Sequence, residues 1–243
     1  MSEPRLLQAD IVRTSALSEL DRRSMRDLMD RHFRDCDAGR FARDLAGKPW
    51  TILLRDAAGG VAGFSTLDVM EAVVDGRAVR AVYSGDTIID ARHRATTALP
   101  RAFLRFLARH AGWTASNADW FWFYVCKGYR TYRFLPVFYH RFHPHPGQPA
   151  PAFEGRVMDA LARLRFGDDY DPSTGVVRVP GDYALREGVG DLTAERLRDP
   201  FVRFFADRNP GWVRGEELVC LASLARANLR PKPAAWLDAE SRA

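Results

Sequence analysis

The most unusual polar residues of this chain lie inside an apolar run, at Tyr83-Ser84-Gly85-Asp86-Thr87. Aspartate is seldom buried without a partner, so Asp86 is a candidate for chemistry. A carboxylate, or a water that it holds, can remove a proton from an attacking nucleophile. Gly85 beside it indicates a bulge or a close approach of a ligand, and Ser84 can position a carbonyl group. The alternative is an aspartate on the solvated face of an antiparallel strand.

A second group of reactive residues follows at Arg92 and Arg94, just before a predicted helix over residues 97–110. Free N–H groups and the macrodipole at a helix start favour negative charge, and arginine binds phosphate or carboxylate in a bidentate manner. We therefore predict that Val79 to Gly112 forms a strand, an arginine-flanked turn and an amphipathic helix that together hold an anionic group. Alternatively, both arginines are ordinary solvated loop residues.

Strands must position these residues. Apolar β-branched runs separated by Asp56-Ala-Ala-Gly-Gly60 and by the hairpin signal Asp75-Gly76 predict an antiparallel meander. A later aromatic run, WFWFYVC, is almost continuously apolar, which is typical of a central strand buried on both faces. The predicted strands of this part are residues 50–55, 61–74, 77–90 and 120–126.

The remaining elements are predicted from helical periodicity and punctuation. A strand over residues 6–13 precedes a long first helix with Ser15 as its N-cap. Pro200 is expected to begin the second half of the helical stretch 192–208. Further expectations are a short helix over 40–46, a helix over 153–166, and strands over 175–179 and 217–224.

Composition restricts the class of protein. With 243 residues, of which 47% are hydrophobic, the chain can bury one large core. It has no stretch of about 18 apolar residues and no signal-like N-terminus, so we expect a soluble cytoplasmic protein without a membrane span. Three widely spaced cysteines suggest neither disulfides nor a zinc site, and no metal is expected. The net charge of +5 comes from arginine, since Lys48, Lys127 and Lys232 are the only lysines.

The order of these elements over roughly the first 145 residues resembles the GNAT superfamily of N-acetyltransferases. The resemblance implies an α/β (α+β) fold, a mixed, mainly antiparallel central sheet flanked by helices, with a C-terminal extension. Residues 1–145 would form the GNAT-like core. Residues 146–243 would pack on it and complete the acceptor site.

The turn after the predicted strand 77–90 also resembles this family. In that family a loop [QR]-x-x-G-x-[GA] holds the diphosphate of coenzyme A, and Ile88-Ile-Asp-Ala-Arg-His-Arg94 resembles its lead-in. The resemblance implies that Arg92, Arg94 and the amides of Ala95, Thr96 and Thr97 bind the phosphate of an acyl-CoA or of another phosphopantetheine-linked donor. Thr97 and Leu99 occupy the two glycine positions and Pro100 lacks an amide donor, so a phosphate held mainly by side chains is expected.

A second similar motif is Phe138-Tyr139-His-Arg-Phe-His-Pro144, which resembles the family's ending "fYeklGF.p" after the fifth strand. The resemblance implies that Tyr139 protonates the departing thiolate. Tyr124, Tyr129 and Tyr132 compete for this role, and Tyr124 and Tyr129 are predicted with Ser84 to bind substrate. Tyr139 can equally be a packing residue.

These features together predict an N-acyltransferase that moves an acyl group from a pantetheine thioester to a small-molecule amine by direct attack. Its donor would be acyl-CoA or an acyl carrier protein, and Asp86 would accept the proton. Two alternatives remain open. One is a non-enzymatic accessory protein with a lapsed donor site, and the other is an aminoacyl-tRNA-dependent transferase, which the basic charge would favour through tRNA phosphate contacts.

Overall fold

The computed structural model describes residues 7–93, 96–113, 119–178, 181 and 183–242. Its centre is one eight-stranded sheet in the order β1-β2-β3-β4-β5-β8-β7-β6. β4 and β5 are parallel, and the other neighbouring pairs are antiparallel. The strands are β1 (Gln8–Arg13), β2 (Trp50–Arg55), β3 (Val61–Val74), β4 (Arg77–Ile89), β5 (Trp120–Cys126), β6 (Tyr170–Asp171), β7 (Val176–Val177) and β8 (Glu217–Ser223).

Hydrophobic patterning located most of these strands correctly. β2, β3 and β5 have the predicted bounds, β4 ends one residue early, and the meander is confirmed. β5 lies in the middle of the sheet and is almost wholly buried, as its apolar run predicted. The strand expected over residues 175–179 shrinks to Val176–Val177, and the short β6 was not predicted.

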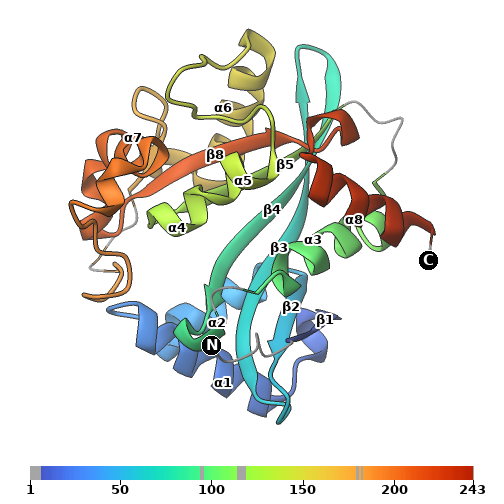
Figure 1. Cartoon of the computed structure of the whole chain (residues 1–243), viewed down its shortest axis with the longest axis vertical. Helices are drawn as coiled ribbons and strands as arrows, with labels where there is room; N and C mark the ends of the chain where they lie inside the picture. Colours follow the sequence, from blue (N-terminus) through green and yellow to red (C-terminus); the bar gives the residue numbers. More distant parts are fainter. Residues whose placement is uncertain (1–6, 94–95, 114–118, 179–180, 182, 243) are drawn as a thin grey trace.

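Helices cover both faces of the sheet (Figure 1). α3 and α8 lie side by side, and they share a core with residues of α4, α5 and α7. On the other face, α1 and α2 pack at one end and α6 at the other. The helices are α1 (Glu19–His32), α2 (Ala38–Ala46), α3 (Ala98–Arg109), α4 (Tyr129–Tyr132), α5 (Phe134–Phe138), α6 (Ala152–Phe166), α7 (Pro200–Arg208) and α8 (Pro231–Arg242).

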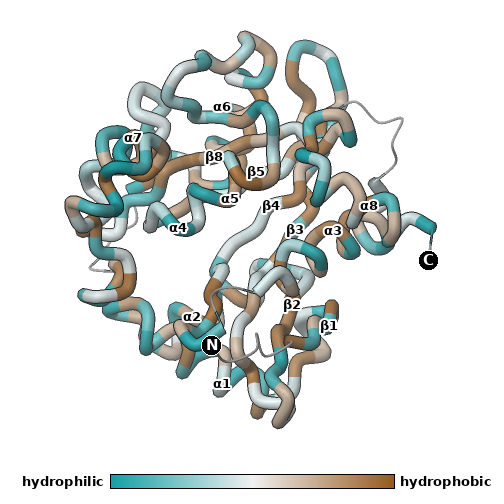
Figure 2. Tube along the Cα trace, in the orientation of Figure 1, coloured by the Kyte–Doolittle hydropathy of each residue, from teal (hydrophilic) through white to brown (hydrophobic). Residues whose placement is uncertain are grey.

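The aromatic rings of β5 divide between these two layers. Trp120, Trp122 and Tyr124 join the core under α3 and α8, whereas Phe121 and Phe123 join the core under α6. Alternate residues of a strand point to opposite faces, so one strand anchors both layers. Figure 2 shows hydrophobic residues concentrated along β5 and β8 and a paler stretch along β4.

The start of the first helix differs from the prediction. Ser15 was expected to cap it, but residues 14–16 form a separate 3-10 turn. The N-cap is Ser18, whose hydroxyl accepts a hydrogen bond from the Asp21 amide at 3.1 Å and donates one to the Asp21 carboxylate at 2.8 Å. The prediction was wrong because serine at either position satisfies the same local rule. Pro200, in contrast, begins α7 as predicted.

The element order of the first 145 residues confirms the predicted GNAT-like arrangement of strand, two helices, three antiparallel strands, helix, parallel strand and helical segment. The later part of the chain adds strands to the same sheet, because β8 pairs with β5 along its length. None of the helices in the described ranges combines the length and apolar character that a membrane crossing requires.

Candidate functional site

The site forms where β4 and β5 part. The two strands pair from Arg80 and Trp120 as far as Ser84 and Tyr124, and beyond this point β3 is the only strand among the described residues with which β4 pairs. The register between β3 and β4 shifts there, so β4 carries an extra residue, and Asp86 has a φ of +29°. The bulge predicted beside Gly85 is thus confirmed. A bulge re-aims the neighbouring side chain, which here is Asp86.

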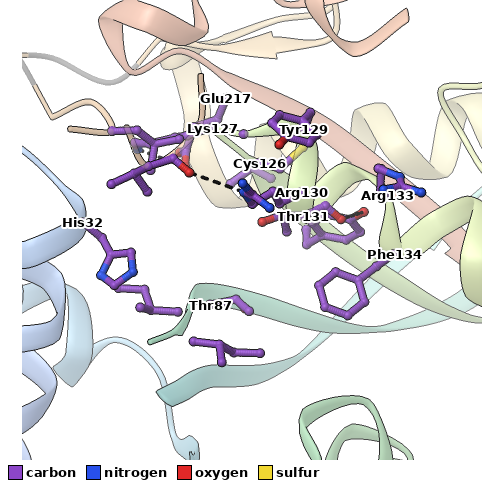
Figure 3. Close-up of a pocket in the computed structure, with 18 of the residues that line it drawn as sticks. His32, Thr87, Cys126, Lys127, Tyr129, Arg130, Thr131, Arg133, Phe134 and Glu217 are labelled. Carbon is purple, nitrogen blue, oxygen red and sulfur yellow. Dashed lines mark hydrogen bonds and ion pairs between the residues drawn. The ribbon is translucent and has the colours of Figure 1, made fainter. Parts of the chain in front are cut away.

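A cavity of about 640 Å³ lies at this opening. His32 at the end of α1 and Thr87 of β4 lie across it from Lys127, Tyr129 and Glu217 (Figure 3). The cavity also contacts residues after position 145, among them Tyr183 and Glu217. Both parts of the chain therefore contribute to its wall.

Asp86 belongs to a group of three charges centred on the buried Lys48. The Lys48 side chain, in the loop between α2 and β2, is 2% exposed, and its Nζ donates to Asp44 Oδ2 at 2.7 Å and to Asp86. The Thr66 hydroxyl donates to the same Asp86 oxygen at 3.4 Å. A Cβ atom on Gly85 would lie 3.0 Å from Lys48 Cε, so the glycine leaves room for the lysine.

The charges in this group shift one another's pKa. Burial raises the pKa of Asp86, but the charge and hydrogen bond of the Lys48 ammonium, together with Asp44 and Lys127, bring the pKa below its usual value, so the carboxylate stays ionised. Burial likewise lowers the pKa of Lys48, and the adjacent Asp86 and Asp44 raise it by more. Burial and the neighbouring Asp86 raise the pKa of Asp44 to about 6. Because 44% of the Asp44 side chain is exposed, solvent screens part of this pKa shift. The repulsion between the Asp44 and Asp86 carboxylates still raises the pKa of Asp44.

A second buried ion pair lies on the facing wall. Lys127 follows β5, and its Nζ is 3.0 Å from Glu217 Oε1 at the start of β8. The same Nζ lies 4.2 Å from the centre of the Tyr183 ring. Burial raises the pKa of the Tyr183 phenol, so this residue is a neutral wall of the cavity.

A smaller apolar cavity of about 50 Å³ lies beneath α3 and α5. Its wall includes Phe103, Trp122 and Tyr139. Four residues line both this cavity and the large one, namely Ser84, Thr87, Thr131 and Phe134. We call these four residues the junction.

The structure brings together the residues predicted for catalysis and substrate binding. Asp86, Ser84, Tyr124 and Tyr129 line the large cavity, and Tyr139 lines the small one. The Ser84 hydroxyl accepts a hydrogen bond from the Trp122 indole at 2.7 Å, and the Tyr124 hydroxyl donates to the Thr131 carbonyl at 3.2 Å. Burial raises the pKa of Tyr139 well above its usual range, so this phenol is protonated at neutral pH. The roles of these residues stay predictions.

The predicted phosphate-binding turn is only partly described, since Arg94 and Ala95 lie outside the described residues. The Arg92 guanidinium holds Asp90 through two bonds of 3.0 Å. The amide of Thr96 donates to the His93 carbonyl, and its hydroxyl accepts from the Ala98 amide at 3.0 Å. Thr97 is the N-cap of α3 without a side-chain cap bond. Arg92 and Thr96 therefore have internal partners here.

Sequence reasoning missed Lys48, Lys127 and Asp44. A signal for the lysines was present, because the chain uses arginine almost everywhere and has only three lysines. A lysine ammonium is compact and fits a buried position that a guanidinium would overfill. Two of the three lysines are buried in this site.

No protein-family model matches the chain, and no curated protein sequence matches it. Among solved structures, one match is a conserved protein from Enterococcus faecalis described as a probable N-acyltransferase. It is 13% identical, with a TM-score of 0.38, over 52% of this chain and 31% of that chain. The chain thus spans about a third of that structure.

Another match is YhbS, a GNAT family N-acetyltransferase from Escherichia coli solved in complex with CoA. It is 18% identical to this chain, with a TM-score of 0.37. The match covers 55% of this chain and 71% of YhbS.

Proposed function

We propose that this protein is an N-acyltransferase that moves an acyl group from a pantetheine thioester to an amine by direct attack. The observation that carries the proposal is the junction, where a narrow apolar cavity and a wide charged one meet between β4 and β5. Such a pair of cavities suits two substrates of different chemistry whose reacting atoms must meet. Holding them in contact supplies much of the rate enhancement.

The narrow cavity is the donor side of the proposal. At about 50 Å³ this cavity has room only for the reacting end of the donor, to which Phe103, Trp122 and Tyr139 provide apolar contacts. Ile88 and Ile89 of β4 pair with β3 but not with β5, so the β4 edge that faces the opening is placed to bond the amides of a pantetheine chain. The protonated Tyr139 phenol then donates its proton to the thiolate as the C–S bond breaks.

The wide cavity is the acceptor side. The amine nitrogen attacks the thioester carbonyl at the junction, and the new C–N bond leaves a proton to be removed. Asp86 is ionised and lines this cavity, so it accepts that proton. Ser84, Tyr124 and Tyr129 border the acceptor on the β5 side.

The turn after β4 would bind the donor's phosphate. The Arg92 side chain is 76% exposed, so its guanidinium can reach a phosphate, at the cost of its two bonds to Asp90, whose side chain is 11% exposed. Asp90 would keep Arg31, whose guanidinium lies 3.7 Å away. Arg94, Ala95, Thr96 and Thr97 complete the proposed phosphate site.

Donor binding and transfer together test the proposal. Acetyl-CoA, a long-chain acyl-CoA and an acyl carrier protein carrying an acyl chain are each added to the full-length protein, and the unfolding midpoint is measured. A bound donor raises this midpoint by mass action. At a donor concentration a hundredfold above Kd, the free energy of unfolding rises by about 2.7 kcal/mol. Transfer is then measured as release of free thiol that requires an added amine. Mass spectrometry identifies the amide product.

Thr87 offers a matched pair of variants at the junction. Thr87→Trp fills the space where the cavities meet and should lower transfer at least about tenfold, whereas Thr87→Ser keeps the hydroxyl that bonds Ser65 at 2.8 Å and should retain most of it. Equal transfer by both variants would contradict the proposed meeting point. Their unfolding midpoints control for loss of fold.

An accessory protein is the second candidate, favoured by the internal bonds of Arg92 and Thr96. It predicts no midpoint shift with any of the three donors. Binding of tRNA that weakens steeply with added salt would instead favour an aminoacyl-tRNA-dependent transferase.

A further inference from the structure

Asp44 and Asp86 share one ammonium group, and their carboxyl groups also lie within hydrogen-bond reach of each other. Lys48 Nζ bonds both carboxylates, at 2.7 Å in the case of Asp44. Asp86 lines the large cavity, and its side chain is 11% exposed. Asp44 is on α2, is 44% exposed, and lies outside the lining of that cavity. The three residues thus connect the cavity to solvent at α2.

The group carries one surplus negative charge, because two carboxylates share one ammonium. Facing it are the Thr66 hydroxyl of β3, Tyr83 of β4, and Lys127 with its partner Glu217. Cys36 and Tyr183, from the segments beside α2, also approach it. Repulsion between two close carboxylates favours the uptake of one proton by the pair.

We propose that Asp44 is the outer residue of a proton path that begins at Asp86. The proposal rests on the proposed function, which supplies the proton. When the amine nitrogen bonds to the thioester carbon, its proton passes to Asp86. A proton then passes from Asp86 to Asp44, and Asp44 releases it to water. The electron pair of the broken C–S bond stays on sulfur, which takes a proton from Tyr139, and the Tyr139 phenolate regains a proton from water before the next turnover.

The surroundings of the two carboxylates determine the direction of this transfer. Lys48 bonds both, but Asp86 also accepts a hydrogen bond from the Thr66 hydroxyl, so the shared proton resides on Asp44, which is more exposed to solvent. Asp86 is thereby restored to the state that accepts the next proton. Asp44 is a positioning residue in this scheme, since it acts through Asp86 and not on the substrate.

The rate test compares wild type with Asp44→Asn from pH 5 to pH 8. Asparagine cannot take the proton, so kcat/KM should fall at least about tenfold at pH 8. The advantage of wild type should shrink towards pH 5, where Asp44 is already protonated. Deprotonation of the amine affects both proteins equally and cancels in the ratio. A ratio that does not change with pH would overturn the proposal.

Asp27→Asn is the matched control, because Asp27 is an exposed aspartate of α1 away from the site. Its rate should equal that of wild type at each pH. A loss of rate with Asp27→Asn that matched the loss with Asp44→Asn would overturn the assignment of the effect to Asp44.

A second readout needs no substrate and separates failure of the path from failure of the proposed function. The raised pKa of Asp44 means that wild type loses stability as pH rises from about 4, the unfolded value, to about 6, the folded value. The Asp44→Asn protein lacks this titrating carboxyl. Its unfolding midpoint should therefore rise relative to that of wild type across this pH interval and then level off. A constant difference would overturn the coupling of Asp44 to Asp86, whether or not a substrate is found.

Discussion

Gly85 is a single residue on which the arrangement of the charged group depends. A Cβ atom there would lie 3.1 Å from Lys48 Nζ and 3.3 Å from the Thr66 hydroxyl. Lys48 is held by two carboxylates in a buried place, so a shift of a few tenths of an ångström to make room would strain both ion pairs. The absence of a side chain at Gly85 therefore controls where the charge of Asp86 is held.

We expect Gly85→Ala to lower the free energy of unfolding by about 1–3 kcal/mol, the usual cost of overpacking a tight site. Urea denaturation measures the change. Gly147→Ala is the control, because a Cβ there meets nothing within 4 Å, and it should stay within about 0.5 kcal/mol of wild type. A Gly85→Ala protein as stable as the control would mean that Lys48 has room to move.

Residue types in the sequence identified one member of this charged group. Asp86 was conspicuous because it interrupts an apolar strand. Asp44 and Lys48 were not, since one lies on an exposed helix face and the other in a loop before Pro49. Their contact with Asp86 arises from the packing of α2 against β4, which local patterns do not contain.

At the scale of elements, α1 contributes His32 and the adjoining Phe33 to the cavity wall. Its start is fixed by Ser18, which bonds both the amide and the carboxylate of Asp21. The helix continues until His32, whose Nδ1 lies 2.8 Å from the Leu28 carbonyl. The placement of the cavity wall thus depends on a cap four turns away.

Removing that cap should destabilise the protein measurably. We expect Ser18→Ala to cost about 1 kcal/mol of unfolding free energy in a urea titration, the usual value for an N-cap. Ser24→Ala changes a serine inside the same helix, where alanine is the better helix former, and should be neutral or slightly stabilising. A smaller loss for Ser18→Ala than for Ser24→Ala would contradict the cap assignment.

α8 is a helix that the sequence did not predict, and the reason is physical. α8 begins Pro231-Lys-Pro233, and two prolines close together are typical of a loop. Proline is nevertheless tolerated in the first turn of a helix, where its missing amide has no partner to lose. α8 exists because it packs on α3, with Glu240 bonded to Arg105 and Arg109, and such a contact is not visible in a local window.

At the scale of the whole molecule, the sheet joins the two parts of the chain. β8 pairs with β5 over six residue pairs from Phe121 to Cys126, and Lys127 bonds Glu217 beyond them. The central aromatic strand would otherwise be an open edge. The later part of the chain is therefore needed for the stability of the core as well as for the cavity wall.

We expect the two parts to unfold in one transition. Leu221→Ala in β8 removes a fully buried side chain and should cost about 2–5 kcal/mol, with fluorescence and far-UV circular dichroism giving coincident urea curves. Leu164→Ala is the control, since that leucine is 62% exposed. Two separated transitions in the Leu221→Ala protein would contradict the single cooperative unit.

The parting of β4 and β5 also bears on the order in which substrates bind. The narrow cavity is bounded by α3 and the wide one extends to α1 and Tyr183, so each substrate of the proposed reaction has its own approach to the junction. Neither has to leave before the other enters, and no acyl-enzyme is required between them. Either substrate can then add first. The released thiol would inhibit by competing with the thioester, and the amide product by competing with the amine.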